Sequence, residues 1–350
     1  MAMTSTVFVG AAAAGSRFRG GLFRKAADSS EFEQVYGGLP EGTQVQAITV
    51  HPEDPRRVYV GTHHGPYKST DGGASWQAIP LPDPGLQVWS ILVHPTQPRT
   101  LFAGTSPVAI FRSNDDGDSW QKLYAQTEPD AVKMDFPCRV MRIAMNPSTT
   151  DEIYATLEVA GTLRSMDGGL SWQDCSADLI KLADQPHLKS KIGSDSETEG
   201  MLDGHALCLS AAQPQTLILA VRMGLFRSDN QGLNWEDMEV GRFAPLTYAR
   251  DVRVSPQDPN VLYACFSPAA RSKDGSVYRS NDLGQTWSRF DHDINAEATM
   301  MAVALHNQDP AQVHCVSRSG QLFSTLDGGA NWSEYRLPDD VRDIYAVACA

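Results

Sequence analysis

The chain has 350 residues, of which 42 are acidic and 29 basic, so its formal net charge is −13. An acidic chain lacks the basic face that a nucleic acid or an anionic membrane surface requires, and we expect neither as a partner. No apolar run approaches the roughly 20 residues that a helix needs to cross a bilayer. From length alone, at about 150 residues per domain, two domains would be expected.

The first elements of the chain read as strands rather than as an export signal. Residues 7–14 are apolar, but no basic flank precedes them and no cleavage context follows. We interpret residues 6–10, 21–25 and 32–36 as three short strands. The six cysteines are widely spaced and form no C-x-x-C pair, which argues against a disulfide scaffold or a zinc ribbon. Together these features favour a reduced, cytoplasmic compartment.

From residue 44 onward one pattern recurs six times. Each copy has an alternating strand, a proline-bearing turn, two further strands and a turn of the form Ser-x-Asp-x-Gly-x-Ser/Thr-Trp. The first such turn runs from Ser69 to Trp76, and the others end at Trp120, Trp172, Trp235, Trp287 and Trp332. Asp can bond its own backbone in a tight turn, Gly supplies a positive φ, and Trp begins the next strand with a large apolar ring. The pattern predicts a four-stranded unit, with strands A to D, whose last hairpin is this turn.

The turn resembles the Asp-box, also called the BNR repeat, of β-propellers. Asn230 replaces the aspartate in the fourth copy, and Asn234 and Asn331 replace the hydroxyl residue in the fourth and sixth. Four-stranded units in series favour one ring over two lobes. We therefore expect an all-β, seven-bladed β-propeller formed by residues 1–350 as a single domain.

The repeat spacing also predicts how the ring closes. The complete units give six blades, at residues 44–86, 87–137, 138–203, 204–247, 248–297 and 298–341. Residues 342–350 read as a strand A with nothing after it, and residues 4–43 supply strands B, C and D without an Asp-box. Pairing the two would build a seventh blade and remove an open edge strand.

The two rims of such a ring differ in their loops. The Asp-box turns and the proline turns share one rim, and the B–C loops and D–A connections share the other. Only the second set varies, so we expect the functional site there, at the mouth of the central channel. The longest insertion, residues 176–204, begins with an amphipathic stretch at 178–183 that predicts a short helix. It would either cover the channel as a lid or form a disordered surface loop.

Histidines near the variable rim are the first candidates for chemistry. His63 and His64 form the B–C loop of the first blade, and His205 begins the fourth strand A. Imidazoles beside carboxylates can bind a divalent metal ion or act as general acids and bases. We consider all three as metal ligands or catalytic groups, with Glu158 as a catalytic carboxylate; the alternative is that they are scattered surface histidines. Three others lie in the repeated turn on the Asp-box rim and are expected to be structural: His51, His94 and His306.

Arginines offer a competing set at the same mouth. The candidate substrate-binding residues are Arg142, Arg222, Arg250, Tyr248 and Arg318. Arg142 and Asp251 occupy corresponding positions in two A strands, so both could face the channel. An arginine-lined mouth on an acidic protein would select an anion or a carboxylate. Alternatively, the arginines pair with Asp251, Asp343 and Glu158 as structural networks.

The resemblance to Asp-box propellers covers the whole chain but does not fix an activity, because one fold carries many. Sialidases have an arginine motif that residues 17–21 do not match, xyloglucan-active glycosidases use two propellers, and sortilin adds a cysteine-rich module. Photosystem II assembly factors are single seven-bladed rings of similar length, although they are exported.

Two hypotheses follow. One is an enzyme, a hydrolase or lyase, acting on a small polar, anionic or carbohydrate-like substrate with or without a divalent metal ion. The other is a non-catalytic binding or assembly module for a protein partner.

Overall fold

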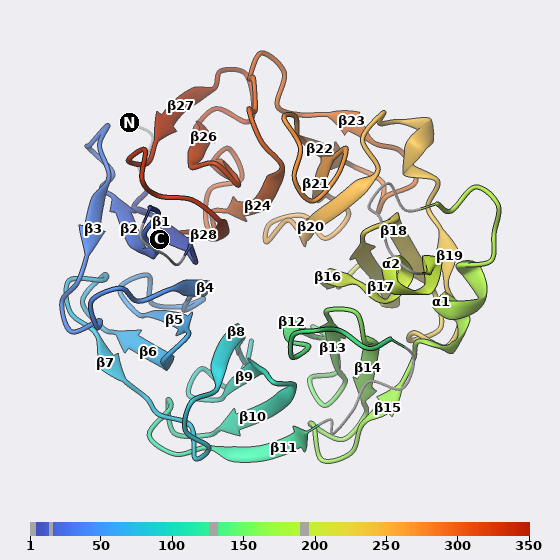
Figure 1. Ribbon diagram of the computed structural model, residues 1–350, viewed down its shortest axis with the longest axis horizontal. Coiled ribbons are helices and arrows are strands. Elements are labelled where there is room, and N and C mark those ends of the chain that lie inside the picture. Colours follow the sequence, from blue (N-terminus) through green and yellow to red (C-terminus); the bar gives the residue numbers. More distant parts are fainter. Residues whose placement is uncertain (1–4, 14–16, 126–131, 190–195) are drawn as a thin grey trace.

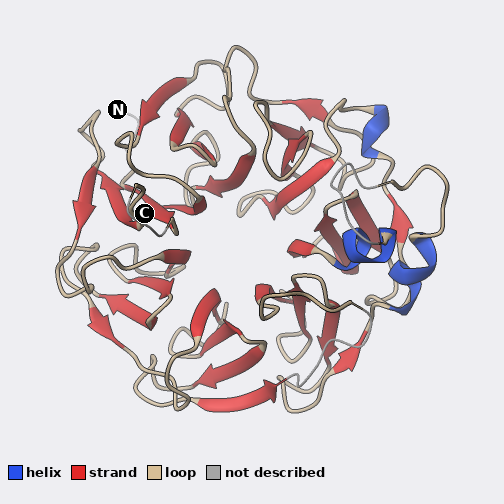
Figure 2. Cartoon of the chain, viewed as in Figure 1, coloured by secondary structure: helices blue, strands red, loops and turns tan. Residues whose placement is uncertain are grey.

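The computed structural model describes residues 5–13, 17–125, 132–189 and 196–350. The described strands form seven antiparallel four-stranded sheets, arranged as blades around a central channel (Figures 1 and 2). This confirms the seven-bladed β-propeller predicted from the repeat. No helix in the described ranges is both long and apolar enough to cross a membrane.

In each of the first six blades, strand A lies at the channel and strand D lies at the outer circumference of the ring. Blade 1 consists of β4 (Val45–Val50), β5 (Val58–Thr62), β6 (Gly65–Ser69) and β7 (Gln77–Ala78). Blade 2 consists of β8 (Gln87–Val93), β9 (Leu101–Ser106), β10 (Ala109–Ser113) and β11 (Gln121–Ala125). Blade 3 consists of β12 (Val140–Met145), β13 (Ile153–Leu157), β14 (Gly161–Ser165) and β15 (Gln173–Asp174). Blade 4 consists of β16 (Gly204–Ser210), β17 (Gln213–Val221), β18 (Gly224–Ser228) and β19 (Glu236–Asp237). Blade 5 consists of β20 (Tyr248–Val254), β21 (Leu262–Ser267), β22 (Ser276–Ser280) and β23 (Ser288–Arg289). Blade 6 consists of β24 (Met300–Leu305), β25 (Val313–Ser317), β26 (Gln321–Thr325) and β27 (Ser333–Arg336).

Blade 7 joins the two ends of the described chain. Strand β28 (Ile344–Cys349) pairs with β1 (Val7–Ala11), and β2 (Gly21–Lys25) and β3 (Glu33–Val35) complete the sheet. The β28–β1 ladder is antiparallel, with Val347 opposite Val9. The ring therefore closes by the pairing of head and tail that the sequence predicts, and β1 is paired along both of its edges, with β28 and with β2.

The polar side chains of each Asp-box form hydrogen bonds within their own turn. Ser69 Oγ accepts from the N–H of Gly73 at 2.8 Å, and Asp71 accepts from both the N–H (2.9 Å) and the hydroxyl (2.6 Å) of Ser75. In the fourth copy the bond reverses, because Asn230 Nδ2 donates to Asn234 Oδ1 at 2.9 Å. Aspartate and asparagine thus support the same turn, which accounts for both departures from the motif.

The repeated histidines are turn residues as well. His51 Nδ1 accepts from the backbone N–H groups of Glu53 and Asp54, each at 3.2 Å. His94 and His306 make the same pair of bonds to the second and third residues after them. These imidazoles cap the A–B turns of their blades, as their repetition in the sequence predicts.

Neighbouring blades approach most closely where a glycine of strand B faces a valine of the next strand A. A Cβ atom on Gly104 would lie 2.5 Å from Val140 Cγ1, and one on Gly61 would lie 2.8 Å from Val88 Cγ1. Gly10 lies against Val45 in the same way. The glycines are therefore required by packing between blades, since their φ angles are ordinary.

The insertion after blade 3 contains two short helices, α1 (Ala177–Leu182) and α2 (Glu197–Leu202). Leu179, Met201 and Leu202 are buried in the apolar cluster of blade 4. Both helices lie over blade 4 and not over the central opening (Figure 1). The predicted helix is present. The described residues of the insertion do not cover the central opening and so do not form the lid considered from the sequence. Residues 190–195 lie outside the described part.

Candidate functional site

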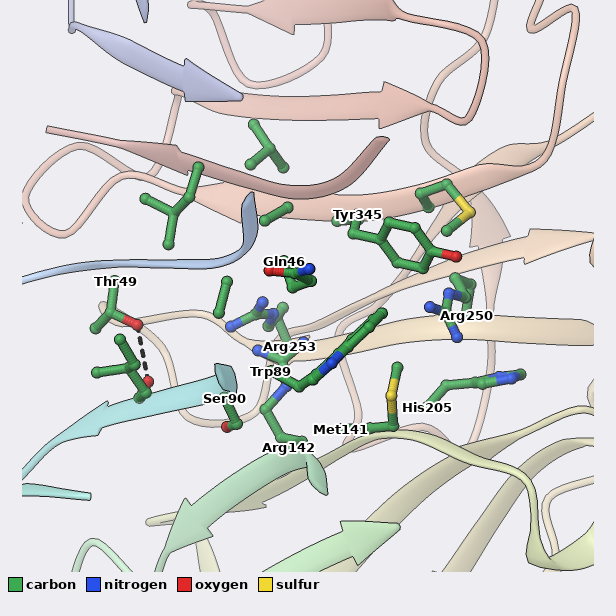
Figure 3. Close-up of a pocket in the computed structure, with 17 residues that line it drawn as sticks. Gln46, Thr49, Trp89, Ser90, Met141, Arg142, His205, Arg250, Arg253 and Tyr345 are labelled. Atoms are coloured by element: carbon green, nitrogen blue, oxygen red, sulfur yellow. Dashed lines mark hydrogen bonds between the residues drawn. The ribbon is translucent and has the colours of Figure 1, made fainter. Parts of the chain in front are cut away.

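Every blade places one residue of strand A out of register with strand B, at the end of the channel near the variable rim. The pairing of each A strand shifts at this residue, which is the geometry of a β-bulge. We call these residues the bulge ring: Gln46, Trp89, Met141, His205, Arg250, Met301 and Tyr345. All seven line one cavity at the channel mouth, which we call the channel cavity (Figure 3). A bulge re-aims a side chain, and here it does so once per blade.

The floor of the channel cavity is an ion cluster with more positive than negative charge. Arg142 Nη2 donates to Asp251 Oδ1 at 3.0 Å, across from blade 3 to blade 5. Arg253 Nε donates to both oxygens of the same carboxylate at 3.1 Å. Burial and the nearby Arg253 lower the pKa of Arg142 to about 10, although Asp251 opposes this. Two guanidinium groups therefore share one carboxylate, which leaves the floor with a net positive charge at neutral pH.

The channel cavity adjoins a second opening of the channel. Arg253 lines both, as do Ile48, Thr49 and Val347. The second opening reaches Pro256 and Asn307 in the turns of the Asp-box rim, whereas the bulge ring lies toward the variable rim.

One wall of the channel cavity is aromatic. The rings of Trp89 and Tyr345 meet edge to face, with their centroids 5.3 Å apart. The Arg139 guanidinium lies 4.0 Å from the Trp89 ring centre, and Arg250 lies 5.6 Å from that of Tyr345. Such a contact between a cation and a ring holds Arg250 at the cavity without neutralising its charge.

Polar atoms of the bulge ring face the cavity without partners. Trp89 Nε1 and Gln46 Oε1 are buried and make no hydrogen bond with any described residue. Arg250 likewise makes neither an ion pair nor a hydrogen bond within the described part of the chain; its contact is the face of Tyr345. Buried polar atoms without partners cost free energy, and a ligand or ordered water would relieve that cost.

His205 is held as a neutral acceptor. Its Nδ1 lies 2.7 Å from the carbonyl of Ala249, so Nδ1 carries the proton and Nε2 accepts. Nε2 lies 3.3 Å from the hydroxyl of Tyr248, which is protonated because burial raises its pKa to about 12. Burial lowers the pKa of His205, so the imidazole is uncharged at neutral pH. Asp203, 3.4 Å from His205, instead binds Arg222 at 2.9 Å.

Glu158 directly follows strand β13, forms an ion pair with Arg139 and is close enough to Arg250 to raise the pKa of that arginine. Burial raises the pKa of Glu158 to about 7, although Arg139 opposes the shift. This carboxyl is therefore partly protonated near neutral pH, which is the state a general acid requires. Its backbone N–H donates to the carbonyl of Arg139 at 2.9 Å, which places the two side chains together.

The other predicted residues are dispersed. Arg318 pairs with Asp343 at 2.8 Å, and Arg222 binds both Asp203 and Glu199 of α2. His63 and His64 lie together on blade 1, where His63 Nδ1 accepts from the N–H of Gln44 at 2.9 Å. His205 is on blade 4, three blades away around the ring.

The structure does not assemble a metal site from these histidines. Among the described residues, no three His, Cys, Asp or Glu side chains are grouped so that they could hold a metal ion. His63, His64 and His205 therefore do not converge on one ligand set, because the ring separates the first two from the third.

Sequence reasoning missed five members of the bulge ring: Gln46, Trp89, Met141, Met301 and Tyr345. Trp89 carried the one available signal, since the other six tryptophans all end an Asp-box. The bulge shifts each of these residues out of the alternation that identifies a strand face, and the shift is not visible in a single sequence.

No protein-family model matches the chain. A xyloglucanase of Hypocrea jecorina (strain QM6a) is 22% identical over 90% of this chain, but the chain spans only 36% of that protein's length. A vacuolar protein sorting/targeting protein 10 of Mycosarcoma maydis is 29% identical over 19% of this chain.

Solved structures of similar shape include GH74 enzymes and YCF48 proteins. An ancestral GH74 enzyme has a TM-score of 0.59 at 18% identity, covering 91% of this chain and 40% of its own. YCF48 bound to a D1 peptide has a TM-score of 0.57 at 14% identity, covering 95% and 88%. YCF48 from Cyanidioschyzon merolae has a TM-score of 0.58 at 14% identity, covering 89% and 91%. At these identities the similarity establishes the propeller fold alone. The proteins with this fold include GH74 enzymes and a YCF48 bound to a peptide.

Proposed function

We propose that this chain is a ligand-binding propeller whose channel cavity receives the anionic group of a small polar molecule. The observation that carries the proposal is Arg250, a cation of the bulge ring that forms no ion pair or hydrogen bond with any described residue, although Asp203 and Glu158 are near enough to raise its pKa. The ion cluster beneath it adds to the positive charge, since Arg142 and Arg253 share only Asp251. A carboxylate entering the cavity would find an arginine already in place.

The remaining unpartnered atoms suit a ligand that also carries hydroxyl groups. Trp89 Nε1 can donate and Gln46 Oε1 can accept, and both are buried in the wall of the cavity. The rings of Trp89 and Tyr345 offer apolar surface beside them. A hydroxylated carboxylate such as a sugar acid matches this set. The xyloglucanase and GH74 relatives support testing carbohydrates, and the peptide-bound YCF48 supports testing acidic peptides.

Calorimetry with glucuronate and with neutral glucose tests the proposal. The native protein should bind glucuronate and not glucose, and Arg250→Met should weaken binding at least about tenfold, because a desolvated charge-assisted hydrogen bond contributes about 1.5–3 kcal/mol. Arg242→Met, which removes an exposed arginine that pairs with Glu239 and does not line the channel cavity, is the matched control. Equal affinity in Arg250→Met and the native protein would contradict the proposal.

A second function, catalysis at the same mouth, has its own supporting observation in Glu158. With a pKa of about 7, this carboxyl could donate a proton to a leaving group, while Arg250 holds the substrate. Activity would then fall as the pH rises through about 7, because the protonated form is lost. Glu158→Gln separates the two functions. A binding module and an enzyme would both keep their affinity for the ligand, but only an enzyme would lose turnover.

A further inference from the structure

Neighbouring blades are joined on the Asp-box rim by a repeated contact. A cation on strand C donates to the backbone carbonyl of the residue that follows the Asp-box aspartate, or its asparagine, in the next blade. Lys68 Nζ reaches the carbonyl of Asp116 at 2.9 Å. The same bond joins three other junctions: Arg24 to Gly72 at 3.2 Å, Arg164 to Gln231 at 3.2 Å and Arg227 to Leu283 at 3.3 Å.

The junction between blades 6 and 7 lacks both halves of this contact. Ser324 stands on strand β26 where the other blades have a cation, and blade 7 has no Asp-box to receive one. Lys25, at the end of β2, occupies the position of the first Asp-box serine. A cavity of about 410 Å³ remains between the blades. We call it the junction cavity; its lining includes Ser5, Lys25, Asp28, His314, Ser324 and Tyr335.

Lys25 is a buried cation with little to bind. The residue is 7% exposed, and its ammonium lies 4.4 Å from the centre of the Tyr335 ring. Its hydrogen bond, to the carbonyl of Ala26, is long at 3.5 Å. No carboxylate of the described residues forms an ion pair with it, although Asp28 lines the same cavity. At least two of its three N–H donors are therefore unused.

A hydroxyl proton is also unused at this cavity. Buried His314 lies between two serines, with Nδ1 2.8 Å from Ser324 Oγ and Nε2 3.2 Å from Ser5 Oγ. Burial lowers the pKa of His314 to about 3, so the ring is neutral and has one donor and one acceptor nitrogen. Whichever serine donates to the acceptor nitrogen, the other serine keeps a free O–H. The cavity thus has an excess of donors in either tautomer.

We propose that the junction cavity binds a small oxyanion, a carboxylate or phosphate group, through the Lys25 ammonium and the free serine hydroxyl. An oxyanion offers hydrogen-bond acceptors and no donors. Acceptors are what this cavity lacks, because its hydrogen-bond donors are in excess. The oxygens of Asp327 on the lining already accept from Thr325 and Asn331, and Asp28 is exposed. These two carboxylates favour a singly charged anion over a phosphate dianion. Burial lowers the pKa of Lys25, and a bound anion would raise it again.

Thermal melting and calorimetry with acetate and with inorganic phosphate, at ionic strength held constant with chloride, test the proposal. The native protein should show a saturable rise in Tm with at least one of the two anions, and the stronger response identifies the carboxylate or the phosphate class. Because a carboxylate such as acetate would also reach Arg250 in the channel cavity, the anion response is compared in the Arg250→Met background, which removes that cation. In this background Lys25→Met should weaken binding at least tenfold. Lys181→Met, which removes an exposed lysine of α1, is the matched control and should leave the response unchanged.

A second measurement keeps the proposal testable if Lys25→Met does not fold. In the native protein, a saturating anion should slow acylation of Lys25 by an amine-specific reagent at least fivefold, read by peptide mass spectrometry, while acylation of the exposed Lys181 is unchanged. Ser324→Ala should reduce that protection. The assignment would be overturned by a rise in Tm that does not saturate with anion concentration or by an unchanged anion response in Lys25→Met. Equal protection of Lys25 and Lys181 from acylation would also overturn it.

Discussion

Most of the arginines at the channel mouth form an ion pair with a neighbouring carboxylate. Arg142 with Asp251, Arg318 with Asp343 and Arg139 with Glu158 form the structural pairs that the sequence left as an alternative. What distinguishes Arg250 is therefore its missing partner and not its residue type. Pairing across blades joins residues far apart in the chain, and a sequence shows which charges are present but not which ones remain unpaired.

The Asp-box aspartates lead to a prediction on acid stability. Hydrogen bonds, first of all from the hydroxyls of Ser75, Ser119 and Ser171, lower the pKa of Asp71, Asp115 and Asp167 to about 2, from an ordinary value of 3.8. A lowered folded-state pKa means that the stabilisation is complete above pH of about 4 and is lost as the pH falls through 2.

Replacing these three aspartates by asparagine tests this. Asn230 shows that an amide supports the same turn, so the variant should fold. Its urea midpoint should fall less between pH 5 and pH 2.5 than that of the native protein. If the two proteins lose stability in parallel over that range, the aspartates do not contribute to acid unfolding.

At the scale of the element, the strand pattern was predictable and the bulge was not. Each Asp-box fixes the hairpin between strands C and D through local hydrogen bonds, so the motif alone locates both strands in six of the seven blades. The bulge ring depends on how strand A pairs with strand B and with the next blade. His205 and Arg250 were identified by residue type, whereas Met141 and Met301 read as ordinary strand residues.

Close approach between blades leads to a second prediction. Gly104→Ala would place a Cβ 2.5 Å from Val140 Cγ1, so the blades must separate or the valine must move. We expect a loss of about 1–3 kcal/mol in the free energy of unfolding, the usual cost of overpacking. Val140→Gly should restore part of it in the double variant, because it removes both Val140 Cγ1 and Val140 Cβ, which would lie 2.6 Å from the added carbon. Urea denaturation measures the cycle, and additive losses would show that the two residues do not clash.

At the scale of the whole molecule, the ring gives each inner strand two neighbours only after β28 is in place. Strand β28 pairs with β1 and also packs between β24 and β4. The sequence predicted this closure because the head and tail together complete one repeat. It did not predict that α1 and α2 would pack on blade 4, since that choice depends on apolar surface exposed only in the folded ring.

Removal of residues 342–350 tests closure. Strand β1 would become an exposed edge, and Val347 and Ile344 would leave the apolar cluster that blades 6 and 7 share. We expect the shortened chain to be insoluble or to lose its cooperative thermal transition. A soluble product with the melting temperature of the full chain would contradict this role of β28.

The bulge ring has a consequence for how such a protein can acquire new specificity. A residue at a bulge is already outside the regular ladder, so replacing its side chain leaves the hydrogen bonding of both flanking strands as it was. The seven positions are spread through the sequence, one in each repeat, yet they share one cavity. Variation at any of them alters the pocket without altering the scaffold. A library restricted to these seven codons would therefore explore ligand recognition on a constant framework.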